Sequence, residues 1–236
     1  MSLEELRIAI ALAMVGFLFL LRFDSARFGA AEFDPGPNYD TPWAIVLRGA
    51  WPLLAISLAS AAAFVLPAGW DALGVDPAGG RTAESLALAL TFGGLGVLAV
   101  FGIAYLRTRT WPPQTIPLAW VPRSILNALG TALVDEIAFR GVLLSLLVTV
   151  GFPVIAAFIV QDLFYGLATR LGADNETLPL LGAALALGAA NGLLALSTGA
   201  ILAPFLVHLV VRFAALAVED LSLIHISEPT RQRCVS

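Results

Sequence analysis

Residues 86–106 read LALALTFGGLGVLAVFGIAYL, an apolar run without a single charged side chain. A helix needs about 20 mostly apolar residues to cross the hydrocarbon core of a bilayer. The run therefore predicts a membrane-spanning helix. The composition of the whole chain agrees, since 59% of its 236 residues are hydrophobic and only 13% are charged. A soluble domain carries about 25% charged residues, so lipid is expected to solvate most of this protein's surface.

Further apolar segments on both sides of this run predict more spans. We expect an all-α fold, a polytopic membrane helical bundle with about seven transmembrane helices. We divide the chain into N-terminal helices and loops (residues 1–123), a core of helices that carries the chemistry (residues 124–218) and a tail (residues 219–236). The other expected spans are residues 8–21, 43–65, 124–150, 153–169, 178–196 and 199–218.

The tail has an unusual sequence. Residues 221–231 read LSLIHISEPTR, which resembles the translation of a sequencing-library adapter. We interpret residues 219–236 as an artefactual tail and leave them out of the reasoning on fold and site, as is done for fusion scars. His225 and Cys234 are therefore not site candidates. A lone cysteine also cannot form an intrachain disulfide.

The distribution of charge predicts topology and partners. The loop between the third and fourth spans carries Arg107, Arg109 and Arg123 and no acid. The positive-inside rule places this loop in the cytoplasm, and seven spans would then place the N-terminus outside. A net charge of −4 excludes nucleic acid as a partner. All basic residues are Arg, and the richness in Ala, Gly and Leu indicates a GC-rich bacterial genome. We expect an integral protein of the bacterial plasma membrane, with membrane lipids as partners.

The span at residues 124–150 contains Asp135, Glu136 and Arg140. An ionisable group at bilayer depth costs about 2.5 to 3.5 kcal/mol, so such groups are functional candidates. Glu136 and Arg140 are four residues apart and can pair on one face of a helix. Asp135 lies about 100° further round the helix, so that arginine need not neutralise it. One acid is thus expected to be paired and one available.

Two later spans carry polar residues at helical spacing. Asp162, Tyr165 and Thr169 are three and four residues apart, and His208 and Arg212 are four apart. We expect all three helices to share one polar pocket, because the charges nearly balance. The alternative is a buried ion-pair network that only fixes helix packing. The predicted pocket combines the acids Asp135, Glu136 and Asp162 with Arg140, Arg212 and a protonated His208.

These segments resemble a known family. The sequence DEIAFRGVLL at residues 135–144 resembles the E-E-x-x-x-R motif of the CAAX protease and bacteriocin-processing (CPBP) family of intramembrane endopeptidases. TGAILAPFLVHLVVRF at residues 198–213 resembles its last core helix, in which a His is followed four residues later by Asn or Asp. QDLFYGLAT at residues 161–169 resembles the helix that ends F-G-L-A-H. The resemblance covers residues 124–218.

The resemblance implies a membrane-associated peptide or protein substrate and a mechanism of hydrolysis. In the family, the first acid and the middle-helix His activate water, and the last His and Asn stabilise the oxyanion. This sequence departs from the pattern at three positions. The first acid is Asp135, Thr169 stands at the middle His, and Arg212 stands at the Asn. Asp162 is a candidate for the missing base. The implied catalytic set is Asp135, Glu136, Arg140, His208 and Arg212, with Asp162 and Thr169 as auxiliary residues.

Other functions stay open at this point. Asp135, Glu136 and His208 could hold a divalent metal, although no H-E-x-x-H spacing is present and no other cofactor is expected. A catalytically inactive family member could act as a membrane binding or immunity protein. A transporter is a third alternative, because acids at the membrane midplane also mark ion pathways. No inverted repeat supports it.

Overall fold

The structure, a computed structural model, describes residues 2–23, 42–66, 82–109, 111, 121–170 and 177–227. The described residues are helical throughout apart from short connections, which confirms the predicted all-α bundle. Helices α4, η3 and α5 follow one another without a break and form one long rod, so the described residues form seven continuous helical rods. The elements are α1 (Leu3–Phe23), α2 (Pro42–Val65), α3 (Thr82–Thr108), α4 (Val121–Asp135), η3 (Glu136–Leu143), α5 (Leu144–Thr149), α6 (Val154–Arg170), α7 (Thr177–Thr198) and α8 (Leu202–Ser227).

Most helix ends lie within a few residues of the predicted spans. The largest difference is in the last helix, which begins at Leu202 and continues to Ser227 instead of ending at residue 218. Gly199 separates this helix from α7. Its φ of 66° is the left-handed conformation typical of a glycine that follows a helix, so α7 ends before it. The predicted artefactual tail, residues 219–236, thus begins inside α8, and residues 228–236 lie outside the described residues. The origin of the tail stays a prediction.

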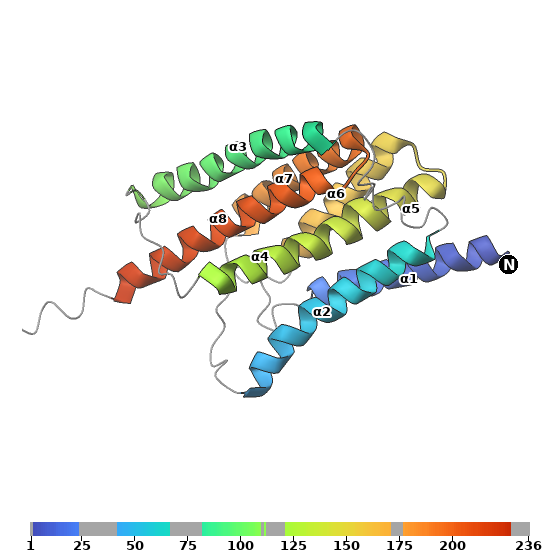
Figure 1. Ribbon diagram of the computed structural model, residues 1–236, viewed down its shortest axis with the longest axis horizontal. Helices are drawn as coiled ribbons and strands as arrows, with labels where there is room; N and C mark the ends of the chain where they lie inside the picture. Colours follow the sequence, from blue (N-terminus) through green and yellow to red (C-terminus); the bar gives the residue numbers. More distant parts are fainter. Residues whose placement is uncertain are drawn as a thin grey trace, which may run out of the picture.

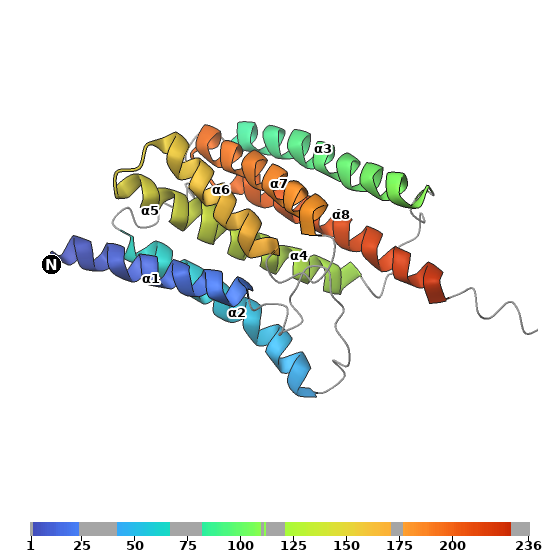
Figure 2. The same cartoon turned by 180° about the vertical axis from the view of Figure 1, so that it is seen from behind.

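The rods form a layered bundle (Figures 1 and 2). Helices α1 and α2 pack together on one side, and α3 lies on the opposite side against α8. The rod of α4, η3 and α5 runs between them with α6, α7 and α8. The segment η3 contacts α1, α2, α6 and α7, so it occupies the centre of the bundle. The charged residues of η3 therefore lie where most helices meet.

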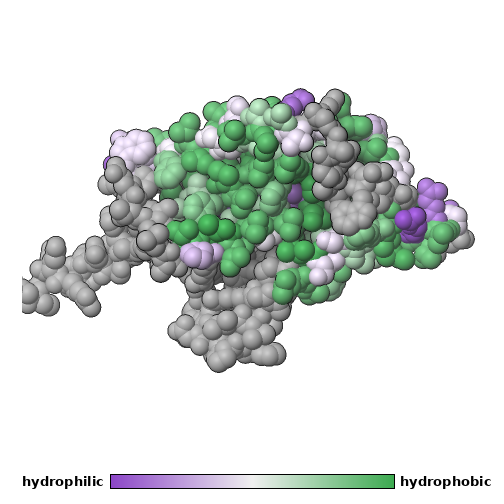
Figure 3. Space-filling model, in the orientation of Figure 1, coloured by the Kyte–Doolittle hydropathy of each residue, from purple (hydrophilic) through white to green (hydrophobic). Residues whose placement is uncertain are grey.

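The outer surface is apolar, as a membrane protein requires. Figure 3 shows mostly hydrophobic side chains over the described part of the face in view. Leu90 on α3 and Ile155 on α6 are 78% and 74% exposed, an arrangement that suits contact with lipid. Among the described residues, Thr82–Leu106 and Leu181–Thr198 are long and apolar enough to cross a membrane. The predicted topology was based on the charges of loops that lie largely outside the described residues, at residues 67–81, 110 and 112–120.

Glycines set the distance between α6 and α7. A methyl group on Gly188 would overlap Oδ1 of Asp162 and lie 2.8 Å from Cδ1 of Tyr165. A methyl group on Gly192 would lie 2.7 Å from Cε2 of Phe158. Real carbon atoms do not approach so closely, so the two helices reach this separation because both positions are glycine. The two glycines are four residues apart and form the small-xxx-small pattern that lets helices approach closely.

Candidate active site

The site begins at a change in backbone geometry. The segment η3 is a π-helix of eight residues, whereas the sequence predicts a regular α-helix through this region. The backbone N–H of Leu144 donates to the carbonyl of Phe139, five residues earlier. All eight residues of η3 are buried. Such turns are rare in proteins and frequently occur at functional sites, so the geometry itself draws attention to Glu136 and Arg140.

One carboxylate oxygen, Oε1 of Glu136, contacts residues of η3, α7 and α8. Oε1 of Glu136 accepts from Nη1 of Arg140 at 3.2 Å and from Nδ2 of Asn191 on α7 at 3.0 Å. The same oxygen lies 2.8 Å from Nδ1 of His208 on α8. Glu136 is 0% exposed, so these contacts replace water around its charge. The predicted pairing of Glu136 with Arg140 is confirmed.

The charge of Arg140 is satisfied on a second side. Its Nη2 donates to the backbone carbonyl of Gly188 at 3.2 Å. Its guanidinium lies over the ring of Tyr165, with Cζ 4.2 Å from the ring centroid, which is a cation–π contact. Arg140 thereby ties η3 to both α6 and α7.

His208 lies between two acids. Because a carboxylate only accepts hydrogen bonds, the contact to Glu136 places the hydrogen on Nδ1. The opposite ring nitrogen, Nε2, then faces Oδ2 of Asp135 at 3.9 Å. That distance is too long for a direct hydrogen bond. It does allow one water molecule beside the two groups to contact both.

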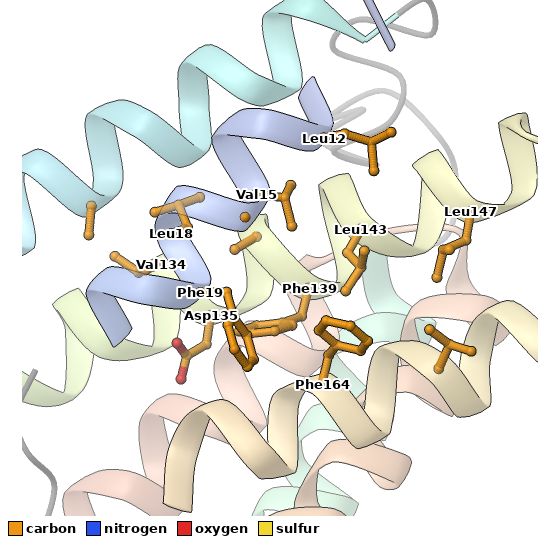
Figure 4. Close-up of a pocket in the computed structure, with 14 residues that line it drawn as sticks. Leu12, Val15, Leu18, Phe19, Val134, Asp135, Phe139, Leu143, Leu147 and Phe164 are labelled. Carbon is orange, nitrogen blue, oxygen red and sulfur yellow. The ribbon is translucent and has the colours of Figure 1, made fainter. Parts of the chain in front are cut away.

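The adjacent acids point to different surroundings. Asp135 lines a cavity of about 240 Å³ that is otherwise apolar, and it is the one charged residue in this lining. In Figure 4, Asp135 lies at one end of the lining and Leu147 at the other. The cavity lies between α1 and the rod of α4, η3 and α5, with α2 and α6 at its sides. Its lining residues are Leu12, Val15, Gly16, Leu18, Phe19, Ala55, Val134, Asp135, Ala138, Phe139, Leu143, Leu147, Val160 and Phe164.

The other expected site residues have neighbours of their own. Nη2 of Arg212 donates to Oδ1 of Asn127 on α4 at 3.1 Å. The hydroxyl of Thr169 donates to the carbonyl of Tyr165 at 2.8 Å, within its own helix. The position that corresponds to the middle-helix His is therefore engaged locally. Asp162 lies against Gly188 of α7, on the side of Arg140.

The geometry does not fit a metal held by Asp135, Glu136 and His208. A metal ion would need all three donors directed at one point. Here the two nitrogens of His208 face different acids, and Oε1 of Glu136 already accepts from Arg140 and Asn191. Among the described residues, no group of three His, Cys, Asp or Glu has an arrangement that could hold a metal ion.

Two partners of the site are absent from the sequence-based set. Asn191 donates to Glu136, and Asn127 accepts from Arg212. Asn191 could have been found from the sequence, since it is an uncharged polar residue within an apolar run. In the structure its side chain is 0% exposed. Asn127 is exposed on α4 and gives no such signal.

The fold and the site together define a membrane-embedded helical protein with a buried carboxylate–histidine centre. Residues 117–214 match the family model described as Type II CAAX prenyl endopeptidase Rce1-like. The matched region contains all three sequence motifs that indicated the CAAX protease family. The family is a protease family that is embedded in membranes. Comparison with curated proteins and with solved structures gives no match.

Proposed function

We propose that this chain is an active endopeptidase of the bacterial plasma membrane that hydrolyses peptide bonds of membrane-associated proteins or peptides. The observation that carries the proposal is the position of His208 between two buried acids. Glu136 holds Nδ1, and Nε2 faces Asp135. A positioned acid–base pair of this kind contributes about 10² to 10⁴ in rate when it transfers protons in the transition state.

The chemistry follows from the order of these groups. A water molecule beside Asp135 and Nε2 of His208 attacks the carbonyl carbon of the scissile bond. The Asp135–His208 pair takes the proton and returns it to the leaving nitrogen as the C–N bond breaks. Glu136 acts as a positioning residue, because its contact with Nδ1 fixes the tautomer and orientation of the ring.

Charge also develops on the carbonyl oxygen. Arg212 lies one turn beyond His208 on α8, at the position that the family fills with Asn. Its guanidinium is the candidate donor to this oxyanion, and the hydrogen bond to Asn127 restricts its orientation. Fixed donors in a buried site stabilise such charge strongly, because no solvent has to reorganise.

The cavity accounts for the substrate class. It is apolar along its lining and ends at the carboxylate of Asp135 (Figure 4). A peptide that presents apolar groups from the membrane can occupy the lining while its backbone lies beside Asp135. This arrangement supports a membrane-associated substrate rather than a soluble, polar one.

One observation favours a second candidate, an inactive family member that binds a membrane peptide or acts as an immunity protein. Thr169 replaces the middle-helix base of the family, and its hydroxyl is engaged with the carbonyl of Tyr165. Such a protein would retain the cavity and the buried cluster but would not turn over substrate.

A cleavage assay separates the two candidates. The wild type, Asp135→Asn and His208→Ala are reconstituted in lipid vesicles with candidate membrane peptides, and products are measured by mass spectrometry. We expect product from the wild type alone. Equal product from all three rejects the proteolytic function, and peptide binding without product from the wild type supports the inactive family member.

A further inference from the structure

A group of buried polar atoms surrounds one turn of α7, at residues 188–192. Gln161 on α6 is 0% exposed, yet neither atom of its amide has a hydrogen-bond partner among the described residues. Within the same described part of the chain, Oδ1 of Asp162 and Oδ1 of Asn191 also lack a partner. Buried polar groups in proteins are almost always satisfied, so each of these atoms calls for a physical explanation.

These groups lie close to one another in space. An ideal Cβ on Gly192 would be 3.1 Å from Oε1 of Gln161, and one on Gly188 would overlap Oδ1 of Asp162. Asn191 lies between these glycines on α7. Arg140 reaches the same turn through its hydrogen bond to the carbonyl of Gly188. The polar atoms therefore belong to one contact region of α6, α7 and η3.

The mixture of donors and acceptors indicates what the region binds. Its acceptors are Oε1 of Gln161 and the oxygens of Asp162 and Asn191, and its donors are Nε2 of Gln161 and Nε of Arg140. A cation would serve only the acceptors and would be repelled by Arg140. An anion would serve only the donors and would be repelled by Asp162. Water donates and accepts, and buried water typically makes about three hydrogen bonds to groups of this kind.

We infer that Gln161, Asp162 and Asn191 form an internal water-binding site between α6 and α7, which supplies the hydrolytic water to Asp135 and His208. The water-binding site itself is inferred from the positions of the buried polar atoms. The supply of hydrolytic water to Asp135 and His208 rests on the proposed endopeptidase function. Hydrolysis within an apolar bundle needs such a supply, because the cavity that ends at Asp135 is otherwise apolar.

A polar route joins this water site to the catalytic centre. Nδ2 of Asn191 donates to Oε1 of Glu136, which also contacts Nδ1 of His208. The second oxygen of Glu136, Oε2, is buried and has no hydrogen-bond partner among the described residues. We place the passage of water from Asn191 along the carboxylate of Glu136, whose Oε1 contacts both Asn191 and His208.

Radiolytic hydroxyl labelling with mass spectrometry tests the water site directly. Radicals formed from bound water modify neighbouring side chains even where bulk solvent does not reach. In nanodiscs, we expect Tyr165, which is 1% exposed, to be modified in the wild type and to lose most of that modification in Gln161→Met. Modification of Tyr105 on α3 is expected to be equal in both. An unmodified Tyr165 in the wild type, or equal modification in the variant, overturns the inference.

The sign of a stability change gives an independent test. Methionine copies the shape of glutamine without its polar atoms. If Gln161 were dry and unpaired, Gln161→Met would raise the melting temperature, because a buried unsatisfied amide is destabilising. With water bound, the variant loses hydrogen bonds and the melting temperature falls. The matched control is Leu163→Met on the exposed face of α6, which should melt like the wild type. A melting temperature of Gln161→Met at or above that of the wild type contradicts the site.

Kinetics tests the supply of water. If the wild type cleaves peptide, Gln161→Met should lower kcat and leave KM unchanged, since Gln161 does not line the cavity that is proposed to bind substrate. An unchanged kcat overturns the supply role. If the wild type cleaves nothing, the proposed endopeptidase function fails, while labelling of Tyr165 still decides whether the water site exists.

Discussion

Nδ1 of His208 and Oε1 of Glu136 lie 2.8 Å apart, although 72 residues separate them in the chain. Since Arg140 and Asn191 donate to the same oxygen, one atom joins η3, α7 and α8. In an apolar bundle such a centre fixes how the helices are rotated against each other, because any other rotation leaves buried charge without a partner. The same contact orients the imidazole toward Asp135.

The carboxylate of Glu136 is expected to be essential for stability. Glu136→Gln keeps the shape of the side chain but leaves Arg140 without its carboxylate partner in the ion pair. Removing one partner of a buried pair costs about 3 to 5 kcal/mol, so we expect a much lower melting temperature in detergent micelles. Glu84→Gln in the exposed first turn of α3 is the control and should have no effect. A Glu136→Gln protein that melts with the wild type would show that the cluster adds nothing to stability.

Two glycines on α7 allow a matched comparison of packing. Gly188→Ala places a methyl group on Asp162 and Tyr165 and should destabilise the protein by about 1 to 3 kcal/mol. Gly182→Ala meets nothing within 4 Å and should stabilise it by about 0.5 to 1 kcal/mol, because alanine is the better helix former. Denaturant titration of both variants measures the difference. Equal effects would mean that α6 and α7 do not approach each other closely at Gly188.

The two acids that could act as a base make different predictions. Asp135 faces Nε2 of His208, whereas Asp162 lies against Gly188 of α7, beside Arg140. Asp135→Asn should lower kcat by about 10² to 10⁴, the range of general base catalysis. If Asp162 supplies the missing base, Asp162→Asn should cause a loss of the same size. Full activity of Asp162→Asn together with loss in Asp135→Asn rejects that role for Asp162.

The cavity predicts a selective effect on substrate binding. Ala138 is 4% exposed and lines the cavity, so Ala138→Leu fills part of it. We expect KM to rise about tenfold, equivalent to about 1.4 kcal/mol of lost binding, while the melting temperature changes little. Ala183→Leu on the exposed face of α7 adds the same atoms outside the cavity and should behave like the wild type. A folded Ala138→Leu protein with unchanged KM would place the substrate elsewhere.

Much of the fold could be predicted from the sequence because long apolar runs recur along the chain, and among the described residues two of them are long and apolar enough to cross a membrane. The pairing of Glu136 with Arg140 also followed from their spacing along one helix. The approach of His208 to these residues could be expected from charge balance, since isolated charges at that depth are costly. These features depend on local spacing or on a strong energetic constraint.

Other features depend on how distant helices meet, and spacing does not encode that. Nothing local shows that Thr169 bonds its own helix, or that Arg212 reaches Asn127 on α4. The residue types Asp135, Glu136 and His208 suggested a metal alternative, but the two nitrogens of His208 face different acids. The last helix extends beyond its predicted end for a simpler reason, which is that residues after 218 were left out as a tail.

The π-helical geometry of η3 has a consequence for how this chain tolerates length changes. A turn closed by a hydrogen bond between residues five apart holds one residue more than an ordinary helical turn. One deletion between Glu136 and Leu143 can therefore restore a regular helix while α4 and α5 keep their orientation, but a deletion between Glu136 and Arg140 would change their spacing from four residues to three. An alignment of related chains should therefore be allowed a one-residue gap here, and a relative with that gap would need a different arginine register to build the same centre.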